Sequence, residues 1–139
     1  YAKMMRLTQR SMFWNREGKF IPNSRDGINL NKLGGRNNIR TIGADYNDVL
    51  FDYHTHVDWG STFADGEGFS TYASGGIKSD EFARSQLNSL ANFKGPMYLG
   101  TREGHIWYMN SNFSRGMLPY NFSPVFTPFN IVWSLSLIR

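Results

Sequence analysis

The segment Asp48–His56 reads Asp-Val-Leu-Phe-Asp-Tyr-His-Thr-His, a short β-forming run that ends in alternating polar residues. Such a run, rich in aromatic and β-branched residues, is typical of a central, mostly buried strand. It leads into a stretch from Trp59 to Lys78 that is rich in Gly, Ser, Thr and Asp and has no regular period. Loops of this length in compact domains commonly carry binding or catalytic groups. We therefore expect the functional residues where this strand ends.

The remainder of the chain predicts an α+β domain with a mixed or largely antiparallel sheet and long loops rich in Gly, Asn and Ser. Ser79 resembles a helix N-cap, because two acidic residues follow it and an apolar stripe comes next. The pattern predicts one main helix at 79–94, a hairpin at 4–22 with its turn at 15–18, an exposed and mobile connection at 23–38, and strands at 97–99, 105–109 and 130–139.

Composition limits the classes of function. The chain has 139 residues, which favours one domain, and it has no Cys, which excludes disulfides and thiolate chemistry. Its net charge of +4 is spread along the sequence rather than clustered, so we do not expect a nucleic-acid partner. No apolar run approaches the ~20 residues of a membrane span. Because the first residue is Tyr1, we expect a C-terminal fragment of a larger protein.

The polar end of the central strand has the pattern of a metal site. A strand has a period of two, so Asp52, His54, His56 and Asp58 would share one face. Neutral imidazole nitrogens together with a carboxylate oxygen are suitable ligands for Zn²⁺, with a fourth position left for water. Paired histidines can also simply hydrogen-bond their neighbours. The third histidine of the chain, His105, lies in an apolar strand and is expected to be structural.

Several strings resemble an uncharacterised domain found at the C-termini of bacterial Rhs-repeat and polymorphic-toxin proteins. They are Tyr53-His54-Thr55-His56, Phe69-Ser70, and Tyr98-Leu99-Gly100-Thr101 followed by Gly104. The resemblance covers roughly residues 12–110. That toxin domain is in turn similar to the JAB/MPN metalloprotease group, in which two His of a His-x-His string and the Asp of a Ser-x-x-Asp string hold Zn²⁺.

Carried over to this chain, the resemblance implies His54 and His56 as the metal-ligand pair. The position that matches the Asp of the Ser-x-x-Asp string holds Ala73 instead. A carboxylate follows Ser79 at the start of the expected helix, and another follows the His pair itself. Asp80 and Asp58 are therefore alternative third ligands.

The same resemblance implies an upstream Glu as general base. Glu17 lies upstream but in an expected turn, and Glu67 in the long loop is the alternative. Ser70 or Ser79 would donate a hydrogen bond to oxyanion charge that develops during the reaction.

The resemblance implies the enzymatic domain of a secreted bacterial toxin or effector, released from a larger Rhs-type carrier and delivered into a target cell. There it would act as a metal-dependent hydrolase of peptide or isopeptide bonds in a protein substrate. One alternative is a metal-independent deamidase, transferase or nuclease in which His54 or His56 is the general base. Another is a non-catalytic module that binds a host protein through its loops and an exposed Trp59.

Overall fold

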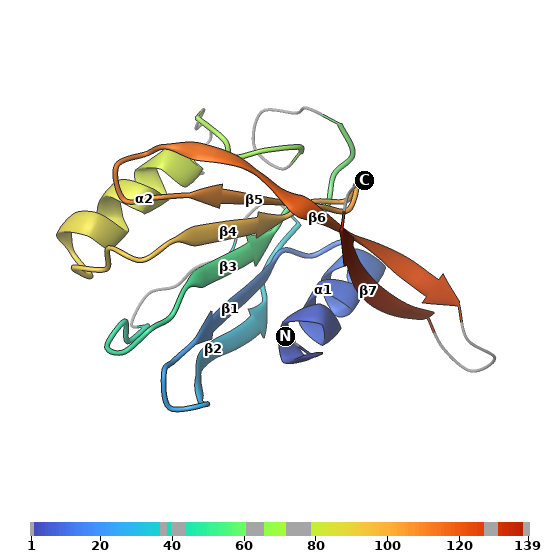
Figure 1. The fold of residues 1–139 in the computed structure, drawn as a ribbon, viewed down its shortest axis with the longest axis horizontal. Helices are drawn as coiled ribbons and strands as arrows, with labels where there is room; N and C mark the ends of the chain where they lie inside the picture. The colour runs from blue at the N-terminus through green and yellow to red at the C-terminus, as the bar shows by residue number, and fades with distance from the viewer. Residues whose placement is uncertain are drawn as a thin grey trace.

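The sheet and two helices form an α+β fold, as the sequence predicts (Figure 1). The computed structural model describes residues 2–36, 39, 44–60, 66–71, 79–126 and 131–137. Within these residues the elements are α1 (Ala2–Trp14), β1 (Gly18–Pro22), β2 (Ile28–Leu33), β3 (Asp52–Thr55), α2 (Asp80–Ser89), β4 (Met97–Gly100), β5 (His105–Met109), β6 (Arg115–Phe126) and β7 (Ile131–Leu137).

The strands form one mixed sheet in the order β2-β1-β3-β4-β5-β6-β7. β3 and β4 are parallel, and each of the other described neighbouring pairs is antiparallel. Because β3 and β4 are parallel, their C-terminal ends lie at the same edge of the sheet, and α2 lies in the connection between them. Ligand sites of open α/β sheets commonly form at such edges.

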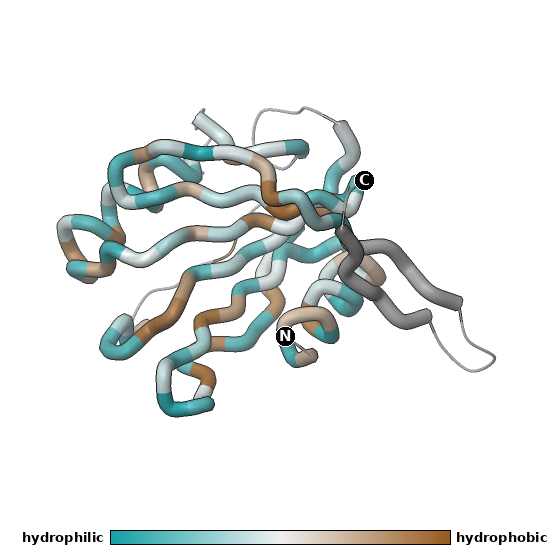
Figure 2. The backbone as a smooth tube through the Cα atoms, viewed as in Figure 1, coloured by the Kyte–Doolittle hydropathy of each residue, from teal (hydrophilic) through white to brown (hydrophobic). Residues whose placement is uncertain are grey.

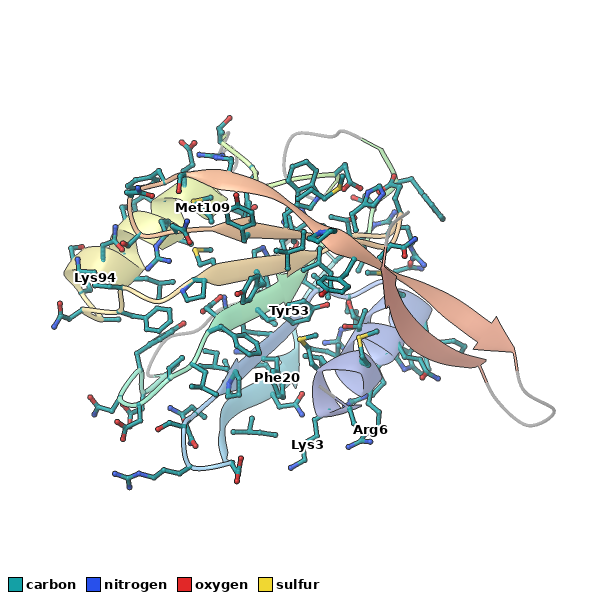
Figure 3. The ribbon with its side chains drawn as sticks, viewed as in Figure 1. Lys3, Arg6, Phe20, Tyr53, Lys94 and Met109 are labelled. Carbon is teal, nitrogen blue, oxygen red and sulfur yellow. The ribbon has the colours of Figure 1, made fainter. Side chains whose placement is uncertain are left out.

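The two helices cover different faces of the sheet. On β3, Tyr53 joins the core cluster of Leu7 and Phe20, which lies under α1. The opposite face packs against α2 through a cluster made of Phe69, Leu87, Phe93, Met97, Leu99 and Met109. Figure 3 shows Met109 beside α2, whereas Lys3 and Arg6 point away from the sheet on the outer side of α1. β3 is therefore buried on both of its faces.

Figure 2 shows short hydrophobic stretches along the strands, separated by hydrophilic ones, and a hydrophilic turn between β1 and β2. The hairpin of β6 and β7 extends beyond the other strands as a two-stranded arm (Figure 1). No helix in the described part of the chain has the length and apolar character needed to cross a membrane.

The expected strand at the start of the chain is wrong, because Ala2–Trp14 is the helix α1. Its buried residues Met5, Thr8 and Met12 recur at spacings of three and four, which is the period of a helix. The apolar and aromatic content of this segment suits a strand as well, and only the spacing of its residues indicates a helix. The helix ends where Asn15 adopts a left-handed backbone, with φ of 52°, as residues that follow a helix often do.

Other element boundaries also differ from the prediction. The expected connection at 23–38 contains β2, whose cross-strand pairing with β1 outweighs its content of Asn. The central strand begins at Asp52 rather than Asp48, because Asp48 lies in a turn with φ of 57°. β6 was not predicted from the sequence, because it contains two prolines, which are unusual inside strands.

The helix and the long loop of the second half differ from the prediction in their extent. α2 ends at Ser89 rather than at residue 94. Residues 61–65 and 72–78 of the expected loop, which include Ala73, lie outside the described residues.

A seam of buried hydroxyl groups joins α1 to β3. Thr8 Oγ1 lies 2.7 Å from the Tyr53 hydroxyl, and Ser11 Oγ lies 2.5 Å from Thr55 Oγ1. The backbone N–H of Gly18 also donates to Thr55 Oγ1, at 2.7 Å. All of these groups are buried, so each hydrogen bond replaces one that water provides in the unfolded chain. The seam fixes the position of α1 relative to the strand that carries the histidines.

We predict that Thr55→Val lowers the free energy of unfolding by about 1–3 kcal/mol, because it removes the acceptor of the buried Gly18 N–H and the hydrogen bond with the Ser11 hydroxyl, which keeps only the Arg16 carbonyl. The matched control is Thr71→Val at an exposed position, where a change within about 0.5 kcal/mol is expected. Both are measured by urea denaturation in the presence of EDTA. Equal stability of the two variants would show that the seam contributes nothing.

Candidate metal centre

One residue of β3, the residue directly after that strand and the first residue of α2 bring two imidazoles and a carboxylate together. His54 lies in β3 and His56 directly beyond its end, while Asp80 is the first residue of α2. His54 Nε2 lies 2.9 Å from Asp80 Oδ1, and His56 Nε2 lies 3.2 Å from Asp80 Oδ2. The two Nε2 atoms are 3.3 Å apart. Among the described residues, His54, His56 and Asp80 form a buried group that can hold a metal ion.

The hydrogen bond of His56 Nδ1 determines which nitrogen of the ring carries the proton. His56 Nδ1 lies 2.9 Å from the carbonyl oxygen of Gly66, which can only accept, so Nδ1 carries a proton. In a neutral ring the Nε2 atom then has a lone pair, and this lone pair faces a carboxylate oxygen of Asp80. Two lone pairs repel unless a cation lies between them or the ring takes a second proton.

The spacing of these atoms suits a tetrahedral metal ion. Two ligands about 2.0–2.1 Å from a tetrahedral Zn²⁺ are roughly 3.3 Å apart. The three observed separations, 2.9, 3.2 and 3.3 Å, lie close to that value. The set of two imidazoles and one carboxylate also matches the donor chemistry of a catalytic zinc site, which keeps a fourth position for water.

Burial and charge give these groups the protonation states that metal ligands need. Burial lowers the pKa of His54, and the nearby positive charge of Lys19 lowers it further, although Asp80 opposes both effects. Burial pushes the pKa of Asp80 upward, but the two imidazoles outweigh this and hold that pKa well below its usual value. His54 is therefore a neutral donor at neutral pH, and Asp80 is an ionised one.

Asp80 is held in place by its own end of the helix and by a neighbouring loop. The Ser79 hydroxyl accepts from the N–H of Phe82 and caps α2, so Asp80 lies in the first turn, where the helix dipole favours negative charge. Ser70 donates to Asp80 Oδ2 through both its backbone N–H and its hydroxyl, at 2.7 and 3.1 Å. Ser70 thus contacts the candidate centre, whereas Ser79 has a capping role.

The rival carboxylate Asp58 lies elsewhere. It accepts two hydrogen bonds from the guanidinium of Arg36, at 2.8 and 3.0 Å, and is not part of the group that could hold a metal ion. Asp52 shares the strand face of the histidines but does not join them either. Its oxygens are taken by Lys19 Nζ and the Tyr46 hydroxyl, each at 2.5 Å. The ion pair of Lys19 with Asp52 was not predicted from the sequence, because it depends on the pairing of β1 with β3, which places Lys19 opposite His54.

The two candidate bases differ in their surroundings. Glu17 is buried and extends the ladder between β1 and β2, since its N–H donates to the Gly35 carbonyl. Lys19 pairs with His54, and continuing this antiparallel register by two residues places Glu17 opposite His56, on the same face of the sheet. Glu67, in contrast, is held by three side chains of other elements, at distances of 2.5–2.9 Å.

Two further residues from the sequence analysis have defined positions. His105 Nδ1 lies 2.9 Å from Glu67 Oε1, and His105 is not part of the group that could hold a metal ion. Trp59 is 66% exposed, and the guanidinium of Arg102 lies 5.8 Å from the centre of its ring.

No family model, curated protein or solved structure matches this chain. The geometry of the site therefore carries the functional argument.

We predict that Asp80→Asn weakens Zn²⁺ binding by more than about 100-fold, because losing even a group that only orients a ligand costs about 10–100-fold. Asp58→Asn makes the same chemical change at the rival carboxylate and should leave the affinity unchanged. Elemental analysis of the purified proteins and competition with a chromophoric chelator measure both. Equal loss in the two variants, or none in either, contradicts the assignment of Asp80 as ligand.

Proposed function

We propose that this domain is a Zn²⁺-dependent hydrolase of peptide or isopeptide bonds, with His54, His56 and Asp80 as metal ligands. The observation that carries the proposal is the lone pair of His56 Nε2 facing Asp80 Oδ2 at 3.2 Å, beside a second imidazole nitrogen. A buried arrangement of this kind is stable when a metal ion lies between the two atoms or when the ring takes a second proton, and the first of these states is the one proposed. Divalent zinc fits both the donor types and their spacing.

The contact between Ser70 and Asp80 supports the resemblance to the JAB/MPN metalloproteases. In that group a Ser and the Asp ligand are three residues apart, whereas here they are separated by ten positions. The contact nevertheless brings a Ser hydroxyl and the carboxylate together across the intervening loop. A longer loop between the two residues is therefore compatible with the same kind of centre.

Glu17 is our candidate for the general base. It is a buried carboxylate that the register places opposite His56, on the strand face that carries both histidines. Glu67 is less suitable, because both of its carboxylate oxygens already accept hydrogen bonds from Thr101, His105 and Trp107.

A bound Zn²⁺ supplies Lewis acidity and lowers the pKa of a water molecule toward about 7. Glu17 accepts the proton of the attacking water and delivers it to the leaving nitrogen. The carbonyl carbon gains the water oxygen as the carbon–nitrogen bond breaks. The hydroxyl of Ser70 donates to Asp80 Oδ2 in this structure, so in the proposed reaction it would turn from that carboxylate to donate to the negative charge that develops on the carbonyl oxygen.

The biological setting of the proposal rests on the resemblance to toxin domains of Rhs-repeat proteins. In this setting the domain is carried by a larger Rhs-type protein, delivered into a target cell, and directed at a protein substrate there. Expression inside a cell is therefore a direct assay of its effect.

We predict that Glu17→Gln lowers hydrolysis by about 10²–10⁴-fold, the usual contribution of general acid–base catalysis, while the variant still binds Zn²⁺. The control Glu81→Gln changes a carboxylate on α2 that pairs with Arg115, and it should retain activity. Cleavage of a peptide library is followed by mass spectrometry, and toxicity is followed by induced expression in cells.

The same assay separates the alternatives. Activity that survives complete removal of metal by EDTA supports a metal-independent enzyme with a histidine base. Undiminished toxicity of the folded double variant His54→Ala/His56→Ala supports a binding module without turnover. Loss of toxicity in Glu17→Gln with metal content retained supports the proposed hydrolase.

A further inference from the structure

We propose that Glu67 is a positioning residue of the metal centre, which acts through the Gly66 carbonyl to fix the tautomer and orientation of His56. This inference rests on the proposed metal centre. It gives Glu67 a role other than that of a base, and it places a set of residues outside the ligands in control of metal affinity.

The carboxylate of Glu67 connects its loop to the neighbouring part of the sheet through hydrogen bonds. Its Oε1 accepts hydrogen bonds from His105 Nδ1 and Trp107 Nε1, and its Oε2 accepts from Thr101 Oγ1 at 2.8 Å. His105 and Trp107 belong to β5, and Thr101 directly follows β4. Two donors on β5 and one directly after β4 therefore hold a single carboxylate of the loop.

The backbone beside this carboxylate is fixed as well. The N–H of Glu67 donates to the Gly60 carbonyl, and the N–H of Gly60 donates to Glu103 Oε1. Gly60 itself has φ of 78°, a conformation that other residues rarely adopt. The two described ends of the loop are thus tied to each other and to Glu103.

Glu103 is a second carboxyl group in this network, since it accepts from the N–H of Gly60. Burial and the hydrogen bond with Glu67 raise the pKa of Glu103. The buried Oε2 atom of Glu103 has no hydrogen-bond partner in the described part of the chain if it carries no proton. When protonated, it donates to Glu67, and hydrogen bonds in turn lower the pKa of Glu67. Glu67 therefore remains ionised and can accept from all of its donors.

These contacts determine where the Gly66 carbonyl lies. Gly66 precedes Glu67 directly, and its oxygen accepts the hydrogen bond from His56 Nδ1 at 2.9 Å. That bond keeps the proton on Nδ1 and turns the lone pair of Nε2 toward Asp80 and His54. Partners of this kind orient metal-binding histidines, and their loss typically costs about 10–100-fold in metal affinity. Glu67 holds that partner in place.

The test uses Co²⁺, whose visible absorption reports ligand geometry, bound to the full chain. Glu67→Gln replaces one acceptor oxygen by an amide that cannot accept, so at least one donor faces an N–H group. We expect Co²⁺ and Zn²⁺ affinity to fall by about 10–100-fold and the Co²⁺ spectrum to change. Glu81→Gln is the matched control and should preserve both affinity and spectrum.

A second variant keeps the inference testable if Glu67→Gln does not fold. Thr101→Val removes one of the three donors with little change in shape, and we expect a weaker effect in the same direction, a loss of several-fold in metal affinity. Circular dichroism of the metal-free proteins verifies the fold of each variant.

The outcomes separate this inference from the proposed function. If the parent protein binds no Co²⁺ or Zn²⁺, the metal centre itself is wrong. If the parent binds Co²⁺ and the folded Glu67→Gln and Thr101→Val variants bind it with unchanged affinity and spectrum, the centre stands and the positioning role of Glu67 is wrong. A reduced affinity with an altered spectrum in a folded variant supports the role.

Discussion

Burial of β3 on both faces is the constraint on which the rest of the structure depends. A polar group inside a protein must find a partner, because water no longer satisfies it. On the α1 face, Tyr53 and Thr55 meet this demand through hydroxyl groups of the helix. On the α2 face, Asp52 meets it with Lys19. Among the described residues, the polar partners of His54 are Asp80 and another imidazole, and its Nδ1 atom has no hydrogen-bond partner. A cation between these groups would satisfy the carboxylate and the imidazole nitrogens that face it.

The candidate centre is assembled from elements that are otherwise structural. α2 lies between the parallel strands β3 and β4, so its N-terminus arrives at the edge where β3 ends. The helix cap at Ser79 therefore fixes the position of Asp80 as well as the start of the helix. In the same way, the network around Glu67 packs a loop against β5 and also holds the carbonyl that contacts His56.

Local sequence signals predicted the elements that neighbouring residues stabilise. They did not predict elements whose conformation depends on pairing with distant parts of the chain. The N-cap at Ser79 and the strands around 97–99 and 105–109 follow from neighbouring residues, and the structure confirms them. The helix α1 was mistaken for a strand, because its apolar and aromatic residues also suit a sheet and only their period distinguishes the two. β2 was not predicted, because its strand conformation is stabilised by hydrogen bonds to β1 rather than by the preferences of its own residues.

The sequence by itself determined that His54 and His56 share one face of a buried strand, because the period of a strand depends only on adjacent residues. It left Asp58 and Asp80 as equal alternatives for the third ligand, and Glu17 and Glu67 for the base. The tertiary structure brings one of these two carboxylates to the histidines, since Arg36 pairs with Asp58 while the fold places the start of α2, with Asp80, beside them. Contacts between residues distant in the chain depend on how helices and strands pack, and no local pattern encodes them.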